Sequence, residues 1–194
     1  MSQMQVFDEG RLRFEFPDTW PLVLKYDDGR YYRGTLGRTG AELAAMDFVA
    51  APEASHLLLL EVKDFRDHEV ANRPRLAKGE LATEIITKAF HTLGALYAGS
   101  RANHPELRPL AGSVQPWPDT LRVVLLLEKD VPPRAGVAGH MSTRDKLKLE
   151  SYLELEDKLL ADLQQKLAPF RIQAAVYSCA TVPIREQWTA TIRP

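Results

Sequence analysis

Two unbroken apolar runs constrain the fold of this 194-residue chain more than any other feature of its sequence. The first run is 57–60, inside the extended segment 56–65, and the second is 121–127. A strand that is apolar at consecutive positions must be covered on both faces, as strands at the centre of a sheet are. Between the two runs, apolar residues recur at helical spacing over 81–97. The order strand, helix, strand predicts a central sheet with helices packed on it.

The N-terminal part of the sequence indicates further strands. Residues 11–16, Arg-Leu-Arg-Phe-Glu-Phe, alternate between charged and apolar, which is typical of a half-buried strand. A second extended pattern covers 22–26. The sequence Asp-Asp-Gly-Arg at 27–30 favours a tight turn, because Asp-Gly supports positive φ. Residues 31–33 are then predicted to return as the partner strand, which would give an extra N-terminal β-hairpin region.

The C-terminal third of the sequence completes the predicted sheet and its helical cover. Residues 131–141 are rich in Gly and Pro, which predicts a flexible connection. A helix is predicted over 143–167, where leucines gather on one side, and 171–181 has the pattern of a last strand. The expected fold is α/β, a mixed central β-sheet flanked by helices. We expect a single domain over 1–194, with its core at about 44–127.

Composition narrows the class of protein. The 25 Lys and Arg against 26 Asp and Glu give a net charge of -1, which excludes a strongly basic protein that binds nucleic acid through bulk charge. The single cysteine, Cys179, excludes an intrachain disulfide framework and a multi-cysteine zinc site. No apolar run reaches the roughly 18 to 20 residues that span a bilayer, and no secretory signal is visible. We expect a cytoplasmic protein without membrane contacts.

Asp47 and the sequence Glu61-Val62-Lys63 form the chief candidate site. Residues two apart on a strand point to the same face, so Glu61 and Lys63 share a side. If the turn between the two strands is centred on Ala54, Asp47 lies directly opposite Glu61, whereas a slip of one residue separates them. Adjacent carboxylates repel each other, and a divalent cation relieves that repulsion. Mg²⁺ binds one or two carboxylates, a backbone carbonyl (here that of Val62) and several waters.

This set of residues favours phosphodiester hydrolysis. A bound cation lowers the pKa of a water molecule and neutralises charge on a phosphate. The ammonium of Lys63 can orient that water or stabilise the developing anion. The alternative is a solvated ion pair between Glu61 and Lys63, which is the ordinary explanation of an isolated Glu-x-Lys sequence. The buried strand, the upstream Asp47 and the following helix favour the catalytic interpretation.

The same residues resemble the PD-(D/E)xK nuclease superfamily, which has the restriction-endonuclease-like fold. The matching sequences are Met-Asp-Phe-Val at 46–49 and Leu-Leu-Leu-Leu-Glu-Val-Lys-Asp-Phe at 57–65, followed by a helix and an apolar strand. The resemblance implies that Asp47 and Glu61 bind Mg²⁺ or Mn²⁺ and that Lys63 assists the attacking water. It implies a metal-dependent endonuclease or exonuclease that cleaves DNA. Small nuclease-type chains also resemble components of anti-phage defence or mobile-element systems.

The chain departs from the pattern of the superfamily at two points. Met46 stands where a proline is common, and the N-terminus is predicted as strands where the superfamily usually opens with a helix. A catalytically inactive module of the same fold is the alternative, with the helix over 143–167 mediating assembly or the domain binding nucleic acid. The expected partner is DNA. Because the net charge is close to zero, a protein partner or a second copy of the chain is expected to contribute to recognition.

Basic residues near the motif are candidates for contacts with a nucleic-acid backbone. These residues are Arg66, Arg73, Arg75 and Lys88. Lys88 lies on the predicted helix with Glu84 and His91 at helical spacing, and the favoured alternative there is a solvated face with a Glu84–Lys88 pair. Glu128 and Lys129 superficially repeat the motif, but adjacent strand residues face opposite sides. We predict that these two residues form an exposed strand end.

Overall fold

The structure is a computed structural model that describes residues 3–39, 42–68, 75–76, 78–130 and 143–193. In this part of the chain the strands are β1 (Met4–Glu9), β2 (Leu12–Pro17), β3 (Leu22–Lys25), β4 (Phe48–Ala51), β5 (His56–Asp64), β6 (Thr120–Glu128), β7 (Ile172–Tyr177) and β8 (Thr189–Ile192). The α-helices are α2 (Glu80–Arg101), α3 (Ala111–Val114) and α4 (Thr143–Leu167). Short helical turns are η1 (Tyr31–Leu36), η2 (Gly37–Thr39), η3 (Arg108–Leu110), η4 (Ala168–Phe170) and η5 (Ile184–Glu186).

The strands form a five-stranded mixed sheet and a three-stranded antiparallel sheet. The order in the large sheet is β3-β4-β5-β6-β7, and in the small sheet it is β1-β2-β8. Strands β3, β4 and β5 are antiparallel neighbours, whereas β5, β6 and β7 run parallel. Parallel neighbours need a long crossover, and α2 and α4 supply the two crossovers that follow β5 and β6. The predicted mixed sheet with flanking helices is confirmed.

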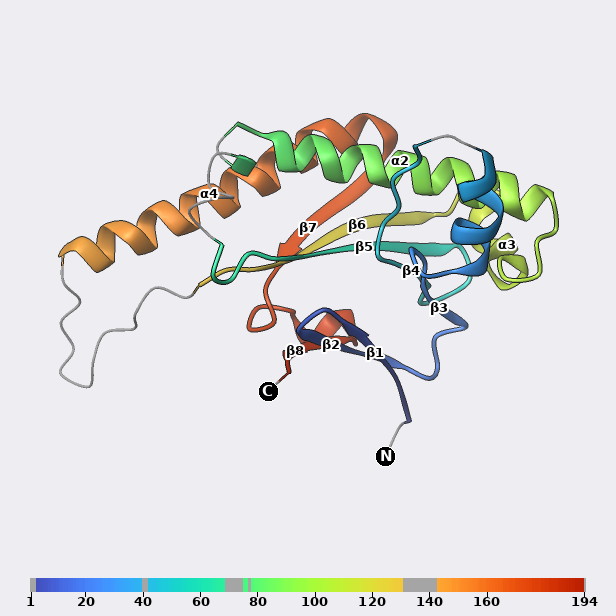
Figure 1. Ribbon diagram of the computed structural model, residues 1–194, viewed down its shortest axis with the longest axis horizontal. Coiled ribbons are helices and arrows are strands. Elements are labelled where there is room, and N and C mark those ends of the chain that lie inside the picture. The colour runs from blue at the N-terminus through green and yellow to red at the C-terminus, as the bar shows by residue number, and fades with distance from the viewer. Residues whose placement is uncertain (1–2, 40–41, 69–74, 77, 131–142, 194) are drawn as a thin grey trace.

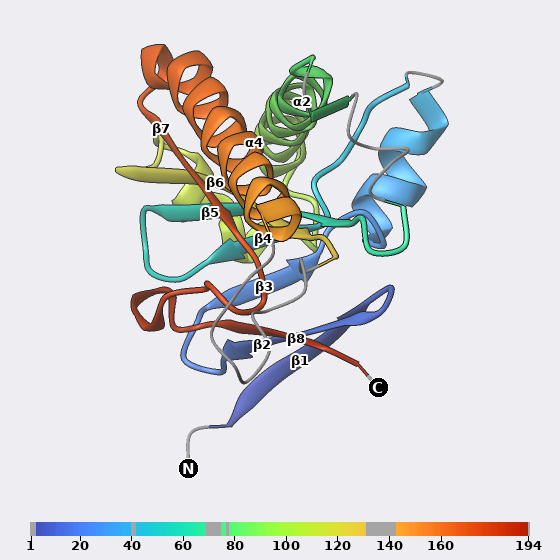
Figure 2. The same cartoon turned by 90° about the vertical axis from the view of Figure 1, so that its left-hand side faces the viewer.

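The large sheet lies between helices on one face and the small sheet on the other (Figures 1 and 2). Odd-numbered residues of β5, such as Leu57 and Leu59, pack in the core beneath α2 and α4. Even-numbered residues, such as Leu58 and Leu60, pack against the aromatic core of the small sheet. The apolar run of β5 is unbroken because both of its faces are covered.

The N-terminal hairpin exists, but it forms from different residues than predicted. It joins β1 to β2 through Gly10, whose φ of 54° favours glycine. Strand β8, which was not predicted, completes this sheet by pairing with β2.

The prediction of a partner strand at 31–33 is wrong. Residues Tyr31–Leu36 form a π-helical turn, and β3 pairs with β4 instead. The carboxylate of Glu106 accepts the backbone N–H groups of Arg30 and Tyr31 at 3.0 and 2.6 Å, and the Tyr31 hydroxyl donates to the carbonyl of Ala95. These distant partners hold the segment beside α2 and outweigh the local turn signal.

The ends of α2 and β6 also differ from expectation. Helix α2 extends to Arg101, beyond the predicted range of 81–97. At Gly99 a Cβ atom would lie 2.6 Å from Cζ of Tyr31, so this glycine permits close packing of the helix against Tyr31. Glu128 and Lys129 are buried and do not form an exposed strand end. Glu128 accepts the backbone N–H of Cys179, and Lys129 lies 3.0 Å from the carboxylate of Glu156 on α4.

Other predicted segments agree more closely with the structure. The helix over 143–167 is confirmed, whereas the last strand is shorter than the predicted 171–181 and covers Ile172–Tyr177. The predicted connection at 131–141 lies outside the described residues. A membrane-spanning helix would need more length or more apolar character than any helix in the described part of the chain has.

Candidate functional site

The hairpin of β4 and β5 places Asp47 opposite Glu61. Phe48 pairs with Leu60 and Ala50 pairs with Leu58, so the hairpin is centred on Ala54 as predicted. The same register, continued by one residue, puts Asp47 beside Glu61. The backbone N–H of Val62 donates to Oδ2 of Asp47 at 2.6 Å, which fixes the carboxylate at the end of the hairpin.

Glu61 is fully buried on the face of β5 that α2 covers. Its Oε1 lies 2.7 Å from Nζ of Lys63 and 2.5 Å from Nζ of Lys88. Its Oε2 is buried and has no hydrogen-bond partner among the described residues. A buried carboxylate oxygen without a partner is unfavourable by about 1–3 kcal/mol or more, because it has lost water and gained nothing in exchange. Glu61 therefore keeps one acceptor oxygen that a further positive group could satisfy.

Helix α2 supplies the polar residues that cover this carboxylate. Glu84 lies 2.9 Å from Nζ of Lys63 and also pairs with Arg75, and Lys88 contacts Glu61 one turn further along. Both α2 side chains are partly buried, so the solvated helix face favoured from the sequence is wrong. The reason is the placement of α2, whose first turns lie over the end of β5.

Burial and neighbouring charges change the pKa values of the site. Burial, together with the charge of Glu61, raises the pKa of Asp47 to about 7, although the Val62 N–H and Lys88 act in the opposite direction. Burial opposes the charged form of Lys63, but Glu61 and Glu84 outweigh it and raise the pKa of this lysine. Near neutral pH, Asp47 is thus only partly ionised, and a further cation would favour its ionised form.

The backbone that carries Asp47 is attached to α2 and β3. Nδ1 of His91 accepts the N–H of Ala44 at 3.1 Å, and Oγ1 of Thr92 accepts the N–H of Met46 at 3.0 Å. The N–H of Tyr26 donates to the carbonyl of Asp47 at 2.8 Å. Thr92 was missed by sequence reasoning. Its signal was a polar residue seven positions after Ile85, on the apolar side of the helix.

The basic candidates are not all brought to the site. Lys88 contacts Glu61, and Arg75 reaches the site through Glu84. Arg66 is instead held by Asp64, which also pairs with Arg11 from the turn between β1 and β2. Arg73 lies outside the described residues.

The donor set at Asp47 and Glu61 fits a divalent cation. Both residues offer hard oxygen ligands, and the unpaired Oε2 of Glu61 is the atom that a cation would satisfy. No group of three or more His, Cys, Asp or Glu residues suited to a metal occurs in the described residues. Two carboxylates are nevertheless a normal protein contribution for Mg²⁺, which keeps several waters and binds substrate phosphates. The carbonyl of Val62 as a ligand stays a prediction.

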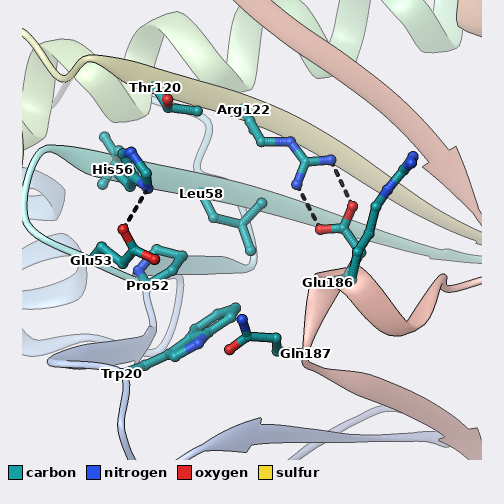
Figure 3. A pocket seen from close by; sticks show the side chains of 11 residues that line it. Trp20, Pro52, Glu53, His56, Leu58, Thr120, Arg122, Glu186 and Gln187 are labelled. Carbon is teal, nitrogen blue, oxygen red and sulfur yellow. Dashed lines mark hydrogen bonds and ion pairs between the residues drawn. The ribbon is translucent and has the colours of Figure 1, made fainter.

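A cavity of about 230 Å³ lies at the opposite end of β5, beside His56 and Arg122 (Figure 3). Arg122 donates to both carboxylate oxygens of Glu186 at 2.7 Å, and the hydroxyl of Tyr177 donates to Glu186 at 2.9 Å. These hydrogen bonds tie η5 to β6 and β7. Arg122, Glu186 and His56 have partners within the fold, so these groups show no chemical requirement for a ligand.

Comparisons of the chain with models of protein families, with curated proteins and with solved structures found no match. The geometry around Glu61 is therefore the basis for a functional proposal.

Proposed function

We propose that this protein is a divalent-metal-dependent nuclease of the PD-(D/E)xK type that hydrolyses phosphodiester bonds of DNA. The observation that carries the proposal is the buried carboxylate of Glu61, which lies opposite Asp47, contacts two lysines through Oε1 and leaves Oε2 unpaired. Most buried side-chain polar atoms have a hydrogen-bond partner, so the unpaired Oε2 beside Asp47 supports a ligand at this position.

The topology of the large sheet supports the proposal. Strand β4 runs antiparallel to β5, α2 follows β5, and β6 then lies parallel beside β5. This is the strand, strand, helix, strand order of the restriction-endonuclease-like core. The small sheet β1-β2-β8 is an addition on the opposite face, away from Glu61.

Each residue of the site has a distinct role in this proposal. Asp47 and Glu61 would hold Mg²⁺ or Mn²⁺, with the Val62 carbonyl as a further ligand. When bound, the cation supplies a water of lowered pKa and neutralises charge on the scissile phosphate. Lys63 orients the attacking water or stabilises the developing anion, and Glu84 holds its ammonium in place at 2.9 Å.

Titration of Mn²⁺ by isothermal calorimetry, with a plasmid-nicking assay on the same samples, tests the proposal. The wild type is compared with Asp47→Asn, which keeps the size of the side chain and an acceptor for the Val62 N–H. Asp119→Asn is the matched control, because Asp119 contacts Ser55 at the far end of β5. We expect binding and cleavage to be lost together in Asp47→Asn and kept in the control.

The other outcomes are equally informative. Mn²⁺ binding without cleavage would support the metal site and point to a missing partner or a different nucleic acid. Absence of Mn²⁺ binding in the wild type would contradict the proposal. It would leave the inactive module, in which the domain serves assembly or nucleic-acid binding.

A further inference from the structure

Lys88 is the contact of Glu61 that comes from outside the sheet. Its Nζ lies 2.5 Å from the oxygen that Lys63 contacts at 2.7 Å. Two ammonium groups on one oxygen repel each other, and their closeness reflects the need of a fully buried carboxylate for positive charge. Lys88 thus supplies one positive charge beside Glu61, where a divalent cation would supply two.

Positive charge is already sufficient at the site in this state. The cations of Lys63, Lys88 and Arg75 offset the carboxylates of Glu61 and Glu84 and the partly ionised Asp47. A divalent cation would add two positive charges to a site that is largely shielded from water. Such an excess is unfavourable unless a cationic side chain leaves or an anion enters.

Lys88 is better suited to leave than Lys63. Lys63 follows Glu61 by two residues on the same strand, and its ammonium is also held by Glu84 at 2.9 Å. Among the described residues, the ion-pair partner of Lys88 is Glu61, and the Lys88 side chain is 18% exposed. Its flexible four-carbon stem allows the ammonium to turn outward without movement of β5.

We infer that Lys88 couples binding of the divalent cation to binding of a substrate phosphate. Before the cation binds, the ammonium of Lys88 neutralises Glu61. When Glu61 ligates the cation, Lys88 is released and contacts a phosphate of the DNA, which restores the charge balance. This inference rests on the proposed function and adds to it a reciprocal dependence between cation and DNA affinity.

Calorimetric titration of Mn²⁺ with and without a short duplex DNA with phosphorothioate linkages tests this role by binding alone. In the wild type, the duplex should tighten Mn²⁺ binding about tenfold. Without DNA, Lys88→Met should bind Mn²⁺ about tenfold more tightly than the wild type, because the competing ammonium is gone. Addition of the duplex should change the Mn²⁺ affinity of Lys88→Met by no more than about twofold.

Two further variants complete the experiment. Lys88→Arg keeps the charge and should retain the coupling of the wild type. Lys166→Met removes a lysine that pairs with Asp162 on α4 and should change nothing at the site. If circular dichroism shows that Lys88→Met does not fold, Lys88→Gln, which also removes the ammonium, replaces it in the same titrations.

Equal Mn²⁺ affinity of the wild type with and without the duplex would overturn the role of Lys88. Equal affinity of Lys88→Met and the wild type would do the same. Mn²⁺ binding that Asp47→Asn abolishes but Lys88→Met leaves unchanged contradicts the Lys88 role alone. No Mn²⁺ binding in the wild type, even with DNA, contradicts the proposed function as well.

Discussion

Glu61 and Glu186 are both buried glutamates of this chain, yet their surroundings differ in kind. Glu186 accepts from Arg122 through both oxygens and from Tyr177 through one, so its charge is fully compensated. Glu61 has two lysines on one oxygen and no partner on the other among the described residues. Burial alone therefore does not identify a functional carboxylate. The distribution of partners over the two oxygens distinguishes Glu186, whose hydrogen bonds are satisfied within the fold, from Glu61, for which we propose a ligand.

The largest expected effect concerns catalysis. Glu61→Gln should lower the rate of plasmid nicking by about 10²–10³-fold, since it removes charge where the reaction needs it. Glu186→Gln should leave the rate within about threefold, because Glu186 contacts Tyr177 on the face of the large sheet opposite to the one that carries Glu61 and Lys88. Nicking rates of the two variants and the wild type, measured with excess Mg²⁺, test both expectations. A similar loss in both variants would contradict the distinction.

The second prediction concerns the pH dependence of stability. The pKa of Asp47 is raised to about 7 from 3.8, so the folded state holds its proton more tightly than the unfolded state. Stability of the metal-free protein should thus fall as pH rises from about 4 to about 7. Asp47→Asn removes this loss and should stabilise the metal-free protein by on the order of 2–4 kcal/mol above pH 7.

Glu186 should show the opposite pH dependence. Burial opposes its ionised form, but Arg122 and Tyr177 outweigh burial and lower its pKa below 4.5. Its stabilising contribution is present above the unfolded pKa and is lost as pH falls through the lowered folded value. Thermal melts from pH 3 to 9 in the presence of a chelator measure both variants. If the stability of Asp47→Asn and that of Glu186→Gln changed with pH in the same way, the opposite pKa shifts of Asp47 and Glu186 would be refuted.

The third prediction concerns the free energy of unfolding at neutral pH. Glu186→Gln should destabilise the protein by about 2 kcal/mol, because Arg122 loses a charged partner with which it forms two hydrogen bonds. Urea unfolding of Arg122→Met and of the double variant completes a mutant cycle. Additive effects in that cycle would contradict direct coupling between the two side chains.

The smallest expected effect is stabilisation by the cation. Millimolar Mn²⁺ should stabilise the wild type and Glu186→Gln by more than about 1 kcal/mol. It should leave Glu61→Gln unchanged, because that variant lacks the carboxylate ligand. Shifts of melting temperature on addition of Mn²⁺ provide the measurement. An equal shift in Glu61→Gln would place the cation elsewhere on the protein.

The placement of Asp47 opposite Glu61 was easier to predict than the surroundings of these residues, because it depends on local strand pairing. The apolar run before Glu61 and the short turn around Ala54 are enough to define the register that puts Asp47 opposite Glu61. The contribution of Lys88 depends on where α2 packs, and helical spacing alone does not contain that information. The same limitation explains why Glu128 and Lys129 were expected to be exposed.

Long-range partners also explain the errors in the N-terminal region. The sequence at 27–30 favours a turn locally, but the carboxylate of Glu106 accepts the backbone N–H of Tyr31, 75 residues earlier in the sequence. This hydrogen bond helps to hold the segment after the turn away from a strand conformation. Strand β8 finds its partner β2 at the other end of the sequence, with Leu12 paired to Ile192. Periodicity within a short window cannot indicate pairing over such distances.

The pairing of β2 with β8 has a consequence for biosynthesis. Phe14 and Phe16 belong to the same buried cluster as Trp188, so part of their cover arrives only when translation has passed residue 188. Until then the nascent chain carries an aromatic strand with one open edge, a state prone to association with other chains. Contacts of such long sequence separation also slow folding after release from the ribosome. Chaperone binding to translation intermediates should therefore persist until the last strand has been made.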